Sequence, residues 1–281
     1  MMTKTRKRHV QLTFIYILLV IGCLAVFLPL SWMVITSLKS MKDITMSRGL
    51  DLFPSGPSFQ NFIDVFKLYP LATYIKNSAI SVGCSTIIGV AFASLAGYGL
   101  SRFAFKGKQF MLSFLLVTQM FPAVMKIIPY YKILVTAHLN DTAFGLMIVY
   151  TSFTIPFCTW MMYGYFNSIP NTLDEAAKID GCSNLQIFRR IIFPLVMPGV
   201  VATVIYAFLQ NWNEYMFASV LISSDNKKTL TYAISTMANS YQIQWNYLMS
   251  ISIISSIPTL LLFIFLQKYL IAGLTAGAVK E

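Results

Sequence analysis

The sequence predicts an all-helical protein that crosses a membrane six times. Of its 281 residues, 57% are hydrophobic and only 11% are charged, whereas roughly 25% of the residues in a typical soluble domain are charged. The mean hydropathy of +0.67 is too high for a protein whose outside is wet, because a soluble chain of this size covers its surface with polar side chains. The outer surface is therefore expected to face lipid.

Six stretches contain no charged residue, and most of them reach the roughly 20 residues that a helix needs to cross the hydrocarbon layer. Their length and their lack of two-residue alternation favour helices over barrel strands. We expect the third and fifth to extend by a turn or to be tilted. The predicted spans are about 12–32, 78–100, 109–125, 142–165, 195–212 and 246–267.

The distribution of basic residues predicts that both ends of the chain lie in the cytoplasm. The basic tail 1–11 precedes a run that is too long for a signal peptide and is followed by no small-residue cleavage site, so we expect a retained helix. Six spans then put the tail 268–281 on the same side. The segments predicted to lie inside hold 12 Lys and Arg in 62 residues, against 9 in 94 outside, as the positive-inside rule expects.

Composition also excludes several classes of protein. The net charge of +11 is scattered over loops and does not indicate a nucleic-acid-binding face. Four cysteines, three of them inside apolar runs, do not make a disulfide scaffold. Two histidines cannot build a metal cluster, and Gly107-Lys108 lacks the rest of a phosphate-binding G-x-x-x-x-G-K-[ST] loop. An enzyme is therefore not expected.

Two patterns predict packing surfaces. Small residues recur every fourth position in the second span, which predicts one helix face that packs closely against a neighbour; they are Ser85, Gly89, Ala93, Gly97 and Ser101. In the outside segment 33–77, a turn and Ser58 as N-cap precede an amphipathic pattern formed by Phe59, Phe62, Ile63 and Phe66. That short helix is expected to lie on lipid or to dock an external partner.

The segment 166–194 is more organised than a connector requires. Thr172 and Glu175 match a capping box, with Asp174 near the positive end of the helix that would follow. Gly181 would end that helix. A first short helix is thus predicted to project into the cytoplasm.

A second short helix is predicted directly afterwards. Ser183 and Gln186 match another capping box, and Leu185, Phe188 and Ile192 would share one face of the helix it opens. Two helices joined by a glycine turn indicate a loop built to fit a partner.

The same segment contains Glu175-Ala176-Ala177, then Asp180-Gly181, and then Ile191 to Pro194 with Pro198. They resemble the E-A-A…G…I-x-x-P cytoplasmic loop of permease subunits of binding-protein-dependent ABC importers. Further stretches are similar to the carbohydrate-uptake branch, of which the maltose importer is a member: Asn77-Ser78, Ala96 to Tyr98, Ser101 to Phe103, Phe105 to Gly107, Trp212 to Glu214 and the tail 273–280. The resemblance covers nearly the whole chain, and it implies the type I ABC importer permease fold. Cys182 stands where the family usually has alanine.

The resemblance implies that the loop docks as coupling helices in a cleft of a cytoplasmic ATPase. The implied coupling residues are Glu175, Ala176, Ala177, Asp180, Gly181, Ile191 and Pro194. Glu175 would meet a basic residue of the partner, although completing the capping box is an alternative role that is compatible with docking. The tail is implied to contact the ATPase through Gly273, Leu274, Thr275 and Gly277, and a frayed terminus is the alternative.

The implied assembly contains a second, non-identical permease, two ATPase copies that bind ATP and Mg, and an extracellular or periplasmic solute-binding protein. This chain itself would bind no cofactor or metal, and would lie in a prokaryotic plasma membrane. An oligosaccharide is the expected cargo, with glycerophosphate or another polar solute as an alternative within the family. An ion-coupled secondary transporter is a less favoured alternative, because only Glu214 offers an acidic group close to a span.

Polar groups inside spans are the first candidates for solute contact. They are Gln119, Gln210, Asn211 and Glu214, with Tyr150, Trp160 and Tyr163 as stacking surfaces. Ordinary packing is the alternative for each of them. In maltose-type relatives the partner permease can hold most of the sugar, so the solute site is not assigned to this chain alone.

Overall fold

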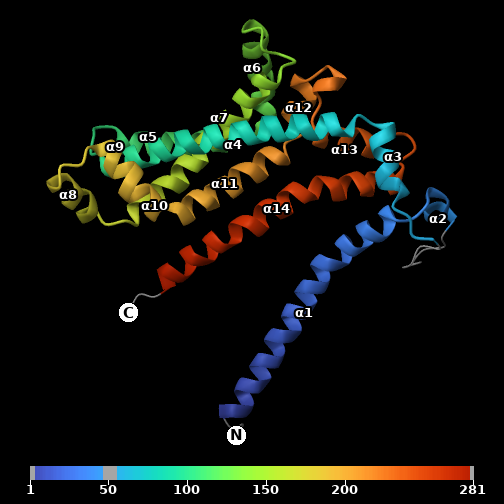
Figure 1. Ribbon diagram of the computed structural model, residues 1–281, viewed down its shortest axis with the longest axis horizontal. Helices are drawn as coiled ribbons and strands as arrows, with labels where there is room; N and C mark the ends of the chain where they lie inside the picture. Colours follow the sequence, from blue (N-terminus) through green and yellow to red (C-terminus); the bar gives the residue numbers. More distant parts are fainter. Residues whose placement is uncertain (1–3, 47–55, 279–281) are drawn as a thin grey trace. The chain divides into compact units, whose positions relative to one another are not determined.

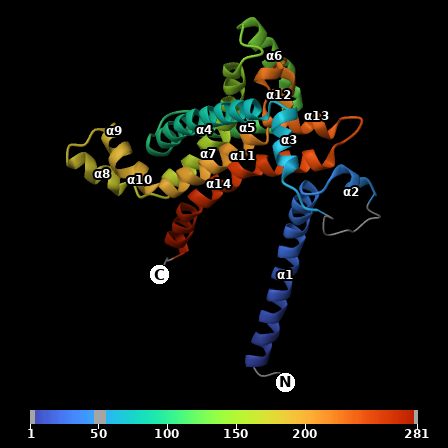
Figure 2. The same ribbon diagram turned by 45° about the vertical axis from the view of Figure 1, so that its right-hand side comes forward.

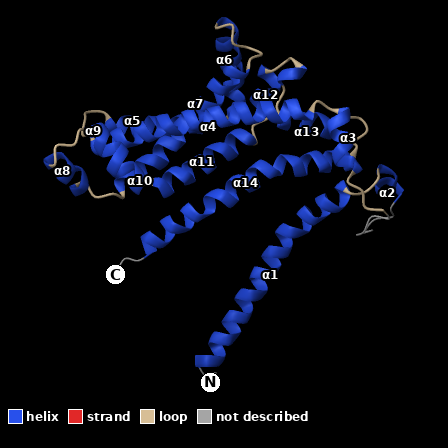
Figure 3. Ribbon diagram, viewed as in Figure 1, coloured by secondary structure: helices blue, strands red, loops and turns tan. Residues whose placement is uncertain are grey.

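The computed structural model describes the backbone of residues 4–46 and 56–278, and the side chains of 11–46 and 56–269. Within these ranges every regular element is helical (Figure 3), which confirms the predicted class. The elements that Figure 1 labels are α1 (Lys4–Ser37), α2 (Met41–Met46), α3 (Gln60–Leu68), α4 (Leu71–Arg102), α5 (Lys108–Met120), α6 (Ala123–Thr136), α7 (Ala143–Asn167), α8 (Thr172–Ile179), α9 (Asn184–Gln186), α10 (Phe193–Leu195), α11 (Met197–Trp212), α12 (Met216–Leu221), α13 (Leu230–Ala238) and α14 (Trp245–Ala278).

The number of candidate spans is compatible with the six predicted from the sequence. Four helical stretches of the described chain are each long and apolar enough to cross a membrane, and the number rises to six if each of two bent helix pairs is one span. The four stretches are Gln11–Ser37, Leu71–Arg102, Ala143–Asn167 and Trp245–Tyr269. The second begins seven residues before the charge-free run does, because α4 continues through Lys76.

One bend interrupts the third predicted span, 109–125, and another lies at the start of the fifth, 195–212. α5 and α6 meet at 99°. Between them Phe121 is extended (φ −72°, ψ 121°) and is followed by Pro122. Proline lacks an N–H and disfavours a helical residue before it, so the helix stops at Met120 although the apolar run continues to Met125. The segment Asn184–Leu195 likewise meets α11 at 79°.

The chain divides into two compact units, of which the first contains Met1–Tyr69 with Thr236–Ile254 and the second Pro70–Ser235 with Ser255–Glu281. In the first unit, the buried amide of Asn61 donates to the carbonyls of Ser37 (2.7 Å) and Lys39 (2.8 Å) at the end of α1. Asn246 of α14 donates to Asn61 Oδ1 at 2.9 Å. One asparagine of α3 therefore ties α1 to the start of α14.

The predicted amphipathic helix is present as α3, but most of its apolar face is exposed within the first unit, with Phe62 half-buried. The helix begins at Gln60 with Phe59 as its N-cap, so the prediction of Ser58 as N-cap was wrong, although Ser58 Oγ accepts a hydrogen bond from the N–H of Gln60 (3.1 Å). Its buried side is formed by Asn61 and Val65, whereas Phe59, Ile63 and Phe66 are exposed. This exposure is compatible with both expected roles of the helix.

In the second unit, α4 and α7 lie side by side in close contact (Figures 1 and 2). Ser85, Gly89, Ala93 and Gly97 are buried. A Cβ atom added to Gly89 would lie 2.8 Å from Thr154 Cγ2, and one added to Gly97 would lie 2.8 Å from Met162 Cβ. The small-residue face of α4 is therefore a helix-packing face, as predicted, and α7 is its partner.

Candidate functional site

The predicted loop joins α7 to α11 and lies where α4 ends, well away from α6 and α12 (Figures 1 and 2). It contains α8, α9, a π-helical segment at Ile187–Ile192 and α10. Gly181 has φ +81°, a left-handed conformation that favours glycine. Around it the N–H of Cys182 donates to the carbonyl of Ala177 (2.9 Å), and the N–H of Gly181 donates to that of Lys178 (3.0 Å). Gly181 thus ends α8 as predicted.

Of the two predicted capping boxes, only the second forms. Ser183 Oγ accepts from the N–H of Gln186 (3.4 Å), and Gln186 Oε1 accepts from the N–H of Ser183 (2.7 Å). The first box was a wrong prediction, because α8 begins at Thr172 itself, with Asn171 as an N-cap that makes no side-chain cap bond. The side chain of Asn171 instead accepts a hydrogen bond from Arg102 Nη1 at 2.9 Å.

Arg102, the last residue of α4, joins three segments at the base of the loop. Its Nε lies 3.0 Å from Asp174 Oδ2, in an ion pair whose side chains are only 7% and 8% exposed. Nη1 donates to the carbonyl of Phe166 (3.0 Å), and Nη2 donates to that of Ile169 (3.1 Å). Tyr98 Oη donates to Asp174 Oδ1 at 3.2 Å. Asp174 is therefore a buried ion-pair partner, which its predicted place near the helix dipole did not anticipate.

Apolar packing anchors the second half of the loop. Ile187, Phe188 and Ile192 are buried, and the ring of Phe188 lies 4.9 Å from that of Tyr98 between centroids. Leu185, predicted to share their face, is instead 61% exposed. The wide π turn changes the angle between successive residues, so 3.6-residue periodicity fails across this segment.

The loop also presents one exposed face. Asp174 and Ala177 are the buried residues of α8. With about 100° between successive helical residues, Glu175, Ala176 and Ile179 lie on the opposite face, and all three are exposed. Of the other predicted coupling residues, Asp180, Gly181 and Pro194 are exposed, Ile191 is half-buried and Ala177 is buried.

Three of the candidate solute residues, Gln119, Asn211 and Glu214, are hydrogen-bonded to α7 between Tyr150 and Thr154. Asn211 is buried, and its amide donates to Ser85 Oγ (3.2 Å) and Thr86 Oγ1 (3.4 Å) while its oxygen accepts from Thr154 Oγ1 (3.3 Å). It therefore links α11 to α4 and α7. Glu214 accepts from the N–H groups of Phe217 (2.7 Å) and Ala218 (3.1 Å) and from Tyr150 Oη (3.0 Å), which places it as a cap of α12.

The other candidates are more accessible. Gln119, whose amide donates to the carbonyl of Phe153 at 3.4 Å, and Gln210 are both exposed. Trp160 is exposed and Tyr163 is half-buried, whereas Tyr150 is buried. The four predicted tail residues lie in the helical backbone of α14, but their side chains fall outside the part of the chain whose side chains the structure describes.

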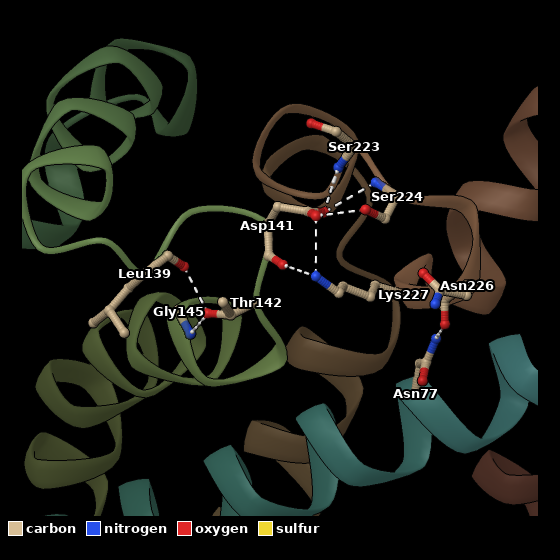
Figure 4. A network of polar contacts seen from close by, with 9 residues as sticks. All are labelled: Asn77, Leu139, Asp141, Thr142, Gly145, Ser223, Ser224, Asn226 and Lys227. Atoms are coloured by element: carbon tan, nitrogen blue, oxygen red, sulfur yellow. Dashed lines mark hydrogen bonds and ion pairs between the residues drawn. The ribbon is translucent and has the colours of Figure 1, made fainter.

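A polar clamp at the turn before α7 was not predicted (Figure 4). Asp141 accepts from the N–H groups of Ser223 (2.9 Å) and Ser224 (3.0 Å), from Ser224 Oγ (2.6 Å) and from Lys227 Nζ (3.1 Å). Asn77 Nδ2 donates to the carbonyls of Asn226 (2.9 Å) and Lys228 (3.0 Å). These bonds hold the segment after α12 to the α6–α7 turn and to α4. Of the residues in the clamp, only Asn77 had been singled out in the sequence, as part of a stretch that resembles the family.

Comparison with known proteins agrees with this geometry. Residues 89–275 match the family described as the inner membrane component of binding-protein-dependent transport systems. The trehalose/maltose transport system permease protein MalG of Thermococcus litoralis is 32% identical, over 94% of this chain and 96% of that protein. The diacetylchitobiose uptake system permease protein DasC of Streptomyces coelicolor is 31% identical, over 90% of this chain and 91% of that one.

A solved structure shows the same fold. A chain of a bacterial ABC transporter involved in the import of the acidic polysaccharide alginate superposes with a TM-score of 0.81 over 96% of this chain and 99% of its own, at 22% identity. Together with the family match, which covers more than half of the sequence, this likeness confirms the expected permease fold. The chain belongs to the family of inner membrane components of binding-protein-dependent transport systems.

Proposed function

We propose that this chain is a permease subunit that forms half of the path by which a sugar or oligosaccharide enters the cell. A solute-binding protein delivers the cargo, and ATP hydrolysis in separate subunits drives the transport. The relatives that support a sugar are permeases of trehalose/maltose and diacetylchitobiose systems. The family match favours this function over an ion-coupled secondary transporter.

The proposed complex pairs this chain with a second, homologous permease and with two ATPase subunits that bind ATP and Mg. Both termini face the cytoplasm, and the loop 166–194 lies on the same side, where the ATPases are. The observation that supports the contact is the exposed face of α8. It combines a carboxylate, Glu175, with the side chain of Ile179, which is 86% exposed, while Leu185 beyond the glycine turn is 61% exposed. Apolar side chains in the cytoplasm are expected to be covered by a partner.

Two substitutions test the proposed coupling face. Glu175→Ala removes a carboxylate available for a charged hydrogen bond, which is worth about 1.5–3 kcal/mol and hence about 10- to 100-fold in docking. Gly181→Asp places a charged side chain on the turn. We expect both variants to insert normally and to lose at least tenfold in ATP-driven uptake, measured in proteoliposomes with the whole transporter.

Gly107→Asp is the matched control for Gly181→Asp. Gly107 also has a positive φ (+93°), and a Cβ atom at either glycine would have no atom within 4 Å. The two substitutions therefore impose a similar backbone strain, of about 1–2 kcal/mol, at different places. Loss of uptake in Gly181→Asp alone supports docking at this turn. Normal uptake by well-inserted Gly181→Asp would refute the coupling role.

The cargo is tested through the binding protein rather than through this chain. We expect that protein to bind disaccharides or oligosaccharides in preference to glycerophosphates, as measured by calorimetry on a panel of both. The reverse preference would replace the sugar with a phosphorylated polar solute within the same family. In this chain, the exposed Gln119 and Gln210 are the polar groups proposed to meet the solute, whereas Asn211 and Glu214 are occupied within the chain.

A further inference from the structure

The first half of the coupling loop has very little apolar anchoring. The buried residues of α8 are Ala177, which contributes one methyl group, and Asp174. The second half differs, because Ile187, Phe188 and Ile192 are all buried there. The contacts that hold α8 in place are therefore mainly polar, and most of them involve Asp174.

Asp174 is held by the guanidinium that also caps the end of α7. Arg102 Nε lies 3.0 Å from Asp174 Oδ2, while the two terminal nitrogens of the same side chain donate to the carbonyls of Phe166 and Ile169. Nη1 also donates to Asn171 Oδ1, directly before α8. One planar group, anchored at the end of α4, thus fixes the end of α7 and the beginning of α8.

A buried ion pair is a poor way to gain stability, because burying two charges costs free energy that apolar residues of similar size do not cost. Arginine nevertheless suits this position, since its fork of five donors can bind several acceptors in fixed directions. The close contacts of Gly89 and Gly97 with α7 make α4 and α7 one packed pair. A displacement of α8 would reach both helices through Arg102.

We infer that Arg102 and Asp174 are positioning residues for energy coupling, which form a strap that makes α8 move as one body with the ends of α4 and α7. This inference rests on the proposed function, because the displacement comes from the ATPase that docks on α8. Without the strap, α8 is attached by Ala177, by its contacts with the π-helical segment Ile187–Ile192 and by its chain connections. The ATPase would then move α8 without moving the spans.

The test replaces the strap without leaving an unpaired charge. Arg102→Met combined with Asp174→Leu fills the same space with apolar side chains, which is often neutral or favourable for stability. Nitroxide labels at Lys178→Cys on α8 and Leu95→Cys on α4 report the distance between the two helices. Cys23, Cys84 and Cys182 are replaced by serine to avoid further labelling. The complete transporter is measured without nucleotide and after trapping with Mg·ATP and vanadate.

With Arg102 and Asp174 intact, we expect a narrow distribution of distances between the two labels, which vanadate trapping does not change. In the double variant we expect a distribution at least twice as broad. Hydrolysis of ATP should stay within twofold, while uptake per ATP falls at least fivefold. Uptake is measured with maltose, trehalose or diacetylchitobiose, whichever the binding protein retains. An equally narrow distribution, or unchanged uptake per ATP, would overturn the inference.

Asp174→Asn keeps the inference testable if the double variant does not insert. The amide oxygen can still accept from Tyr98, so the loop keeps its shape, but the ion pair is lost. We expect a two- to fivefold loss of uptake per ATP and a broadened distribution, and values equal to the wild type would overturn the inference. Absence of ATP-driven uptake in the wild-type complex would instead count against the proposed function, and the label distances would still test the strap.

Discussion

Replacing Gly97 with alanine tests the close contact between α4 and α7. The added Cβ atom would lie 2.8 Å from Met162 Cβ and 2.9 Å from the backbone nitrogen of Tyr163, whereas carbon atoms in contact prefer about 3.5–4.0 Å. The nearest atoms include main chain, so the two helices must separate by roughly 1 Å, and such overpacking costs about 1–3 kcal/mol. Alanine has the higher helix propensity, which offsets about 1 kcal/mol of that loss.

Gly99→Ala provides the matched control on the same helix. A Cβ atom at Gly99 would have no atom within 4 Å, so this variant has the propensity gain without the clash. The two variants should therefore differ by about 1–3 kcal/mol in the free energy of unfolding. Unfolding of the purified protein in increasing SDS, followed by circular dichroism, measures the difference. Equal midpoints for the two variants would refute the inferred tightness of the α4–α7 contact.

Three further predictions concern other parts of the chain. Asn61→Ala removes the amide that donates to the carbonyls of Ser37 and Lys39. It should lower the free energy of unfolding by about 1–3 kcal/mol in the same assay. A change below about 0.5 kcal/mol, the usual limit for surface substitutions, would contradict the role of Asn61 in joining α1 to α14. Burial alone would raise the pKa of Asp141, but the hydrogen bonds from Ser224, Lys227 and Ser223 outweigh it and hold the pKa below its ordinary value. Ionised Asp141 therefore contributes most to the free energy of unfolding above about pH 4, its ordinary pKa in an unfolded chain, and contributes less as the pH falls below that. Asp141→Asn should destabilise the protein at pH 7 and much less at pH 3. An equal effect at both pH values would count against the clamp. Deletion of 273–281 should change ATPase stimulation by the loaded binding protein if the tail reaches the ATPase, and unchanged stimulation would favour a frayed terminus.

Local signals in the sequence predicted the elements that depend on nearby residues. Four of the charge-free runs coincide with the helices that are long and apolar enough to cross a membrane, because the cost of placing charge in hydrocarbon acts on each run by itself. The second capping box and the turn at Gly181 formed as expected, since both depend on residues within four positions. The face of small residues on α4 was predicted from its four-residue spacing, although its partner, α7, was not.

The failed predictions have long-range causes. The first capping box is absent while Arg102, 69 positions before Asn171 in the chain, occupies the side chain that would cap α8. No local pattern links Arg102 to Asp174: Arg102 stood in a stretch that resembles the family, whereas Asp174 was placed only near the positive end of its helix. Asn211 and Glu214, polar residues in an apolar stretch, are hydrogen-bonded to residues of other helices, and their contact with solute stays a prediction.

The clamp around Asp141 has a consequence for where the protein can mature. All four cysteines are free, two of them exposed. Within the described residues, the α6–α7 turn and the segment after α12 are therefore joined by hydrogen bonds and an ion pair of Asp141 and Asn77 with serine, lysine and backbone partners, and not by a disulfide. Such ties form as soon as the helices assemble and need no oxidant or thiol isomerase. The architecture of this end of the protein is therefore indifferent to the redox state of the compartment it faces.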